Sequence, residues 1–220
     1  MVFLPFHTSA QAAAENYLFI DGDAFLINKK NALYYRSISE NTTDTLPVDD
    51  DFESEFVRLV TSNNKPYIVS ISGGKIWSVE RSGLKRIDNS FEHKMTFGSN
   101  VFVHRDTIFK FGGYGYWSKR NFLTYFSTTS REWEYYPINS DSYLPPAVSG
   151  ARGVYHDGQF YFDGGAKIDP YNGIAEMPSK HVWRFNFSEK SWSDLGVTNF
   201  QVSKYAESAD IGHGRVLVRK

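Results

Sequence analysis

The sequence predicts an all-β protein. Short runs of aromatic and β-branched residues, such as Ile108 to Phe111, favour extended chain. Diglycines and polar stretches such as "TTSRE" separate these runs, and glycine permits the positive φ of a tight turn. With 41% apolar and 17% aromatic content, the 220 residues can build a substantial core. We therefore expect many short antiparallel strands in one domain.

Charge and composition exclude several classes of partner and chemistry. The 24 basic and 25 acidic residues give a formal charge of -1, so no basic field attracts nucleic acid or an anionic membrane, and we expect neither as a partner. The apolar runs have strand length, well below the roughly 20 residues of a membrane-spanning helix. The absence of cysteine excludes disulfides and thiolate chemistry but does not assign a compartment.

Residues 1–16 form a leading segment with two possible interpretations. A brief apolar run precedes a small-residue stretch, "SAQAAAE", that is typical of a signal cleavage region. However, no Lys or Arg precedes the apolar run, and the run is short for an export signal. The segment is either a degenerate export signal or a plain leading segment, so the protein could be cytoplasmic or exported.

Two segments of the chain repeat the same order of features. Each has a strand, a polar turn, a strand ending in a diglycine, a variable loop, an aromatic strand, a turn and a strand that begins at tryptophan. The diglycines begin at Gly112 and Gly164, 52 residues apart. Gly113 precedes Trp133 by 20 residues and Gly165 precedes Trp192 by 27, and an insertion in the variable loop accounts for the difference.

On these marks the chain resembles the kelch-repeat family of the galactose oxidase-like propellers. Four-stranded blades of that family recur about every 50 residues around a β-propeller. The resemblance covers residues 97–138 and 148–196. It implies that six residues have a structural role, ending strands and packing between blades: Gly112, Gly113, Trp133, Gly164, Gly165 and Trp192.

The resemblance implies one kelch-like propeller domain over residues 17–220, with about four to five blades. The expected blades cover residues 17–48, 56–90, 97–138 and 148–196, with a partial blade at 205–220. We expect three strands within residues 17–38. Because an open ring exposes strand edges, either both ends share one blade or the chain is part of a larger ring. We prefer the larger ring, since members of this family usually have six or seven blades.

The longest predicted loops lie on one face. In an up-and-down blade, the connection from the second to the third strand and the connection to the next blade emerge on the same side. We expect this side to bind a peptide, a protein or a glycan, because aromatic and charged residues accumulate there. The candidate ligand-binding residues are Tyr116, Trp117, Lys119, Arg120, Tyr143, Arg152, Asp169 and Tyr171. Alternatively, the aromatic residues cap the ends of the blades.

Catalytic motifs are scarce, and we expect neither a metal nor another cofactor. The six histidines have no metal-ligand spacing, and His104 and His156 fall in matching turns on the opposite face. Copper-radical oxidases with this fold need a cysteine, which the chain lacks. Kelch-like sialic acid mutarotases need neither metal nor cysteine and remain the enzymatic alternative. A binding module is preferred, because an enzyme should have several ionisable groups that converge in the channel. The sequence offers only Arg152 and scattered carboxylates.

Overall fold

The computed structural model describes residues 16–20, 24–29, 32–37, 40–48, 52, 57–90, 96–169, 173–176, 181–199, 208–210 and 216–218. Within 16–29, 168–176 and 208–218 it describes the backbone alone. The regular structure of these residues consists of β-strands, which confirms the predicted all-β class. The described residues form no helix, and therefore none that is long and apolar enough to cross a membrane.

Two four-stranded antiparallel sheets come first along the chain. The first contains β1 (Asn16–Ile20), β2 (Ala24–Lys29), β3 (Ala32–Ser37) and β4 (Thr42–Leu46). The second contains β5 (Val57–Ser62), β6 (Lys65–Ser70), β7 (Ile76–Glu80) and β8 (Gly83–Arg86). The predicted three strands of the first sheet omit β4, because four of its five residues are exposed and show no apolar alternation.

Two further four-stranded sheets contain the sequence repeats. The third sheet contains β9 (Asn100–His104), β10 (Thr107–Phe111), β13 (Leu123–Ser127) and β14 (Glu132–Tyr135). The fourth contains β16 (Arg152–His156), β17 (Gln159–Asp163), β20 (His181–Asn186) and β21 (Ser191–Val197). Both are antiparallel meanders in chain order, as the repeat predicts.

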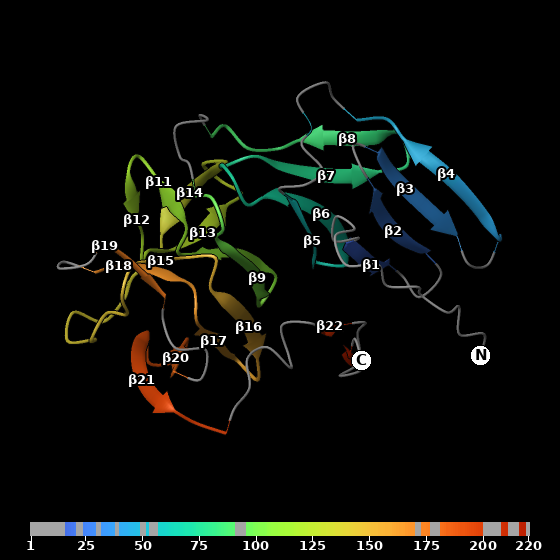
Figure 1. The fold of residues 1–220 in the computed structure, drawn as a ribbon. Helices are drawn as coiled ribbons and strands as arrows, with labels where there is room; N and C mark the ends of the chain where they lie inside the picture. The colour runs from blue at the N-terminus through green and yellow to red at the C-terminus, as the bar shows by residue number, and fades with distance from the viewer. Residues whose placement is uncertain are drawn as a thin grey trace.

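The four sheets are arranged one after another around their first strands (Figure 1). β1 contacts β5, β5 contacts β9, and β9 contacts β16, so the first strands are innermost and the fourth strands outermost. This is a propeller-like arrangement. β22 (Ser208–Asp210) and β23 (Val216–Val218) pair with each other in a separate two-stranded sheet. Most of residues 205–220 lies outside the described residues, so ring closure by both ends of the chain remains a prediction.

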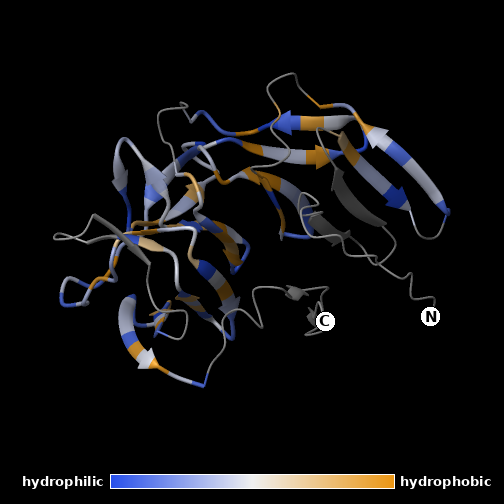
Figure 2. Cartoon of the chain, in the orientation of Figure 1, coloured by the Kyte–Doolittle hydropathy of each residue, from blue (hydrophilic) through white to orange (hydrophobic). Residues whose placement is uncertain are grey.

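Each boundary between neighbouring sheets has its own hydrophobic core. Leu33, Ile68 and Trp77 pack between the first and second sheets. A second cluster includes residues of the second and third sheets, and the largest cluster joins the third sheet to the fourth around Phe111 and Phe162. Figure 2 shows the corresponding hydrophobic bands along β5 to β8. Each fully buried side chain of this size contributes about 1.5–3 kcal/mol, so these cores hold the sheets in place.

The two repeat tryptophans occupy equivalent positions. Trp133 is the second residue of β14 and lies opposite Phe126, and Trp192 is the second residue of β21 and lies opposite Phe185. Both reach the preceding sheet close to the end of its second strand. The Trp133 indole donates a hydrogen bond to the Gly74 carbonyl at 2.8 Å. The Trp192 and Phe111 rings pack together with their centroids 4.8 Å apart.

The second glycine of each repeat diglycine is required by its surroundings. Gly113 and Gly165 have φ of 103° and 82°, which disfavour residues with a side chain. A Cβ at Gly113 would lie 2.7 Å from the Thr96 carbonyl oxygen, and one at Gly165 would lie 2.8 Å from the Ala151 nitrogen. At both positions the backbone that leads into the innermost strand lies too close to the glycine Cα to leave room for a Cβ.

Candidate functional site

The connections of the third and fourth sheets differ greatly in length at their two ends. Short turns of two to four residues, 105–106, 128–131, 157–158 and 187–190, lie at one end. The long connections 112–122, 136–151 and 164–180 emerge at the other end, which we call the long-loop face. This division follows from the antiparallel order of each sheet.

Backbone hydrogen bonds join the long connections into a layer. Within it lie the short strands β11 (Tyr114–Gly115), β12 (Ser118–Lys119), β15 (Val148–Ser149), β18 (Ala166–Asp169) and β19 (Gly173–Glu176). β11 pairs with β12, a bridge joins Arg120 to Val148, and β15 continues the pairing to β18 and β19. In Figure 1 these strands gather at the left of the view. The described parts of the long connections therefore form one hydrogen-bonded layer at this end of the third and fourth sheets.

The turn between β11 and β12 presents two aromatic residues in a strained conformation. Tyr116 and Trp117 have φ of 50° and 64°, in the left-handed region. Two-residue hairpin turns of this kind normally take Asn-Gly, because a bulky side chain there costs roughly 1–2 kcal/mol. Tyr116 is 53% exposed and Trp117 is 89% exposed. An indole with this exposure covers no core side chain, so packing does not compensate for the strain.

Lys119 and Arg120 carry buried nitrogen atoms without partners. Burial lowers the pKa of Lys119, and its Nζ has no hydrogen-bond partner in the described structure. The Arg120 guanidinium lies over the Phe122 ring, 5.7 Å from its centroid, and its Nε is also buried without a partner among the described residues. These side chains place unsatisfied donors next to the Trp117 turn.

Tyr143 lies on the connection 136–151 and stacks on Trp183 of the fourth sheet. Their ring centroids are 5.7 Å apart with an interplanar angle of 24°, and Tyr143 is 74% exposed. His181 lies near Trp183, and its Nε2 is 3.4 Å from Asp194 Oδ1. His181, Trp183 and Asp194 are not among the ligand-binding residues predicted from the sequence. The period-two spacing of His181 and Trp183 beside the variable loop is a signal that could have identified them.

Arg152 begins the inner strand β16, as expected. Its Nε donates to Asp163 Oδ1 at 2.8 Å, and Asp163 is directly opposite it on β17. Burial raises the pKa of Asp163, while the hydrogen bond and charge of Arg152 lower it. The pair lies next to the fourth-sheet diglycine, at the long-loop end of the sheet.

Of the remaining two candidates, the structure describes the backbone of one. Asp169 ends β18, where its backbone is opposite Gly173. Tyr171 lies outside the described residues. The structure therefore brings Tyr116, Trp117, Lys119 and Arg120 together in one hairpin region and places Tyr143 on the adjoining connection. Asn121 Nδ2 links these two parts by donating to the Pro145 carbonyl at 2.9 Å.

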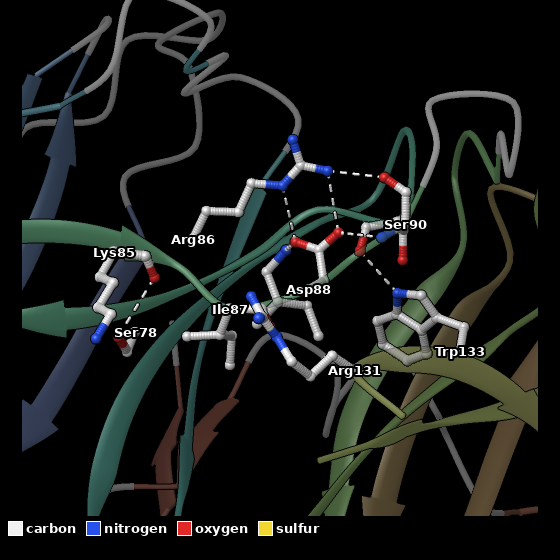
Figure 3. Close-up of polar contacts among 10 residues, drawn as sticks. Ser78, Lys85, Arg86, Ile87, Asp88, Ser90, Arg131 and Trp133 are labelled. Carbon is white, nitrogen blue, oxygen red and sulfur yellow. Dashed lines mark hydrogen bonds and ion pairs between the residues drawn. The ribbon is translucent and has the colours of Figure 1, made fainter. Parts of the chain in front are cut away.

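A polar cluster between the second and third sheets belongs to the scaffold. Figure 3 shows Arg86 contacting both carboxylate oxygens of the buried Asp88, each at 3.2 Å, and Trp133 beside them. Lys110, which is 3% exposed, donates to the Gly73 carbonyl and lies 4.9 Å from the Trp133 ring centroid. Burial lowers the pKa of Lys110 to about 7, against the opposing effect of the Asp88 carboxylate.

Metal-ligating residues do not converge in the part of the chain that the structure describes. No group of three or more His, Asp or Glu side chains there could hold a metal ion. His104 and His156 occupy equivalent last positions of β9 and β16, at the short-turn end. His104 Nδ1 lies 2.7 Å from the Tyr155 hydroxyl, and burial lowers its pKa. This half-buried histidine stacks on Phe187 at the edge of the core between the third and fourth sheets.

Comparison with known proteins supports the fold. No protein-family description and no curated protein sequence matches this chain. The solved structure of YjhT, a β-propeller, is similar with a TM-score of 0.62 at 13% sequence identity. The similarity covers 84% of this chain and 65% of YjhT, so the chain spans about two thirds of that protein's length. At this identity the likeness shows an all-β propeller fold and does not extend to function.

Proposed function

We propose that the long-loop face is a non-catalytic binding surface for a peptide, a protein or a glycan. The observation that carries the proposal is the distribution of exposed apolar residues. The described residues include eight exposed large hydrophobic side chains: Phe97, Tyr116, Trp117, Phe122, Tyr135, Tyr143, Leu144 and Val197. Six of them lie on the three long connections or at a strand end that adjoins one, whereas Phe97 precedes β9 and Val197 ends β21 at the same end of the sheets. Apolar side chains gathered on one face of a protein typically mark an interaction site.

The strained turn supports the same proposal. Tyr116 and Trp117 adopt a conformation that favours glycine and asparagine, yet Trp117 remains 89% exposed and Tyr116 is only about half covered. Strain that packing does not explain is common in segments that bind ligands. The turn places the backbone of Trp117 at the tip of a hairpin that is itself bonded to the layer through Phe97 and Arg120. This arrangement presents a rigid aromatic anchor at low cost in side-chain entropy.

The polar groups of the face suit a ligand rich in oxygen acceptors. Lys119 Nζ and Arg120 Nε are buried donors without partners in the described structure, and each such group costs about 1–3 kcal/mol until it is paired. Peptide carbonyls and sugar oxygens both accept such hydrogen bonds. An aromatic anchor with adjacent unpaired donors is the arrangement expected of a recognition site.

Titration of the chain against glycan and peptide panels tests the proposal. Trp117→Ala should weaken binding of any ligand found by about tenfold or more and leave the fold intact, since surface anchors contribute about 1–3 kcal/mol. Arg105→Ala is a matched control, because Arg105 is exposed in a positive-φ turn on the opposite face. Equal losses in both variants, or no loss in Trp117→Ala, would reject the proposed surface.

A carbohydrate isomerase resembling sialic acid mutarotases is the second candidate function. The ion pair of Arg152 with the buried Asp163 supports it. The pair joins the two innermost strands of the fourth sheet, and the pKa of the Asp163 carboxyl group is raised. Monitoring the interconversion of N-acetylneuraminic acid anomers by NMR tests this candidate. Acceleration that is lost in Arg152→Met would favour the enzyme, and an uncatalysed rate in the wild-type chain would reject it.

A further inference from the structure

His181 and Trp183 carry two buried nitrogen atoms that have no hydrogen-bond partner. They are two residues apart on β20, so their side chains lie on the same side of the fourth sheet. Trp183 is 4% exposed, and its Nε1 and the Nδ1 of His181 have no partner within the described structure. Both atoms lie at the end of β20 that follows the variable loop. They are therefore unsatisfied at the margin of the long-loop face.

Asp194 determines which hydrogen-bonding role His181 can take. Its Oδ1 lies 3.4 Å from His181 Nε2, and it also accepts the Gly196 N–H at 2.8 Å, which holds the carboxylate in place. A carboxylate beside Nε2 favours the hydrogen on that nitrogen. In the neutral imidazole, Nδ1 then presents a lone pair. The site consequently offers one donor, Trp183 Nε1–H, and one acceptor, His181 Nδ1.

Tyr143 covers the Trp183 ring through a single stacking contact. It stacks on the Trp183 ring, remains 74% exposed, and its hydroxyl makes no hydrogen bond within the described structure. A ligand with an apolar ring face could replace the Tyr143 ring on Trp183 at little enthalpic cost. Replacement would also give the two orphan nitrogens access to partners, which removes a penalty of burial.

We propose that a neutral sugar ring binds here, stacked on Trp183 in place of Tyr143. An exocyclic hydroxyl of the sugar extends past the indole edge into the ring plane and accepts from Trp183 Nε1–H, and a neighbouring hydroxyl donates to His181 Nδ1. A carboxylate has no hydrogen to donate to Nδ1, so an acidic group fits the site less well. The inference rests on the proposed binding function of the long-loop face and selects a neutral glycan from its ligand classes.

Indole signals of the 220-residue chain labelled with ¹⁵N-tryptophan provide the test, since its five tryptophans give five resolvable probes. The probes are methyl α-D-mannopyranoside, methyl β-D-galactopyranoside, methyl β-D-glucopyranoside, methyl β-D-glucuronide and acetyl-trialanine amide. At least one neutral glycoside should shift the Trp183 signal downfield and slow its hydrogen exchange. Trp183→Phe should weaken binding of that glycoside about five- to tenfold, and His181→Phe should weaken it similarly.

Trp77→Phe is the matched control, because Trp77 also has a buried Nε1 without a partner in the described structure but lies between the first and second sheets. It should change affinity less than twofold. If Trp183→Phe fails to fold, the Tyr143→Ala variant provides the test. Removing the Tyr143 ring from Trp183 should increase affinity for the glycoside about threefold or more. Unchanged or weaker binding would overturn the proposal.

The same spectra separate this inference from the function on which it rests. A shift of Trp117 without Trp183 would retain the binding surface and overturn the sugar site. Movement of Trp183 by the glucuronide or the peptide alone would also overturn it. No shift of the Trp183 signal with any neutral glycoside would overturn the sugar site, whatever the Trp117 signal does.

Discussion

Trp133 donates its indole hydrogen to the carbonyl oxygen of Gly74, 59 residues earlier in the chain, at 2.8 Å. The bond joins the outermost strand of the third sheet to the β6–β7 connection of the second. The Trp133 ring also lies under the Lys110 ammonium, which donates to the neighbouring Gly73 carbonyl. A residue that the sequence marks as a repeat signature therefore links two sheets through polar contacts as well as apolar packing.

Trp133→Phe should lower the free energy of unfolding by about 1–3 kcal/mol. Phenylalanine retains most of the apolar ring but leaves the Gly74 carbonyl without its donor. Urea denaturation measures the change. Trp117→Phe is the control and should stay within about 0.5 kcal/mol of wild type, because Trp117 is 89% exposed. Equal stability of the Trp133 variant and wild type would show that the indole hydrogen bond contributes nothing.

Lys110 should make stability depend on pH above neutrality. Burial lowers its pKa from 10.5 to about 7 in the folded chain, so between these values the unfolded chain binds more protons. Stability from this group should therefore rise with pH from about 7 to 10, by roughly 3 kcal/mol. Comparing denaturation of wild type and Lys110→Met at pH 7 and pH 9 isolates this effect. Parallel pH profiles would show that Lys110 is not perturbed.

Arg152→Met should destabilise the chain by about 1–2 kcal/mol at pH 7, because Asp163 then loses a charged partner in a buried position. Burial already raises the folded-state pKa of Asp163 above its ordinary value of 3.8, so ionised Asp163 destabilises the folded chain. The deficit of the variant should therefore shrink as pH falls toward 4. Thermal denaturation at pH 7 and pH 4 tests this, and a deficit that grows at low pH would contradict it.

The repeat made the third and fourth sheets predictable, because β10 and β17 have apolar alternation and end at glycines that the structure requires. The same reasoning omits β4, whose residues are polar and exposed and which forms by pairing with β3. Its position depends on a neighbouring strand, and local composition does not show that dependence.

The candidate site was predictable in location but not in detail. Strand geometry assigns Trp117 and Tyr143 to one face, yet no sequence pattern shows that Trp117 occupies a left-handed turn. His181 and Asp194 are 13 positions apart and meet across the β20–β21 pair, where a register shift follows Val182. The bulge changes which residues are opposite each other, and bulges cannot be located from alternation alone.

The Tyr116→Asn, Trp117→Gly double variant tests the binding surface most directly. Asn-Gly suits the two-residue turn, so the variant should be about 1–2 kcal/mol more stable than wild type while it loses the aromatic anchor. Binding of a ligand identified with the wild-type chain, measured by calorimetry beside the unfolding free energy, should fall at least tenfold. Unchanged binding in a folded, stabilised variant would contradict the assignment of function to this face.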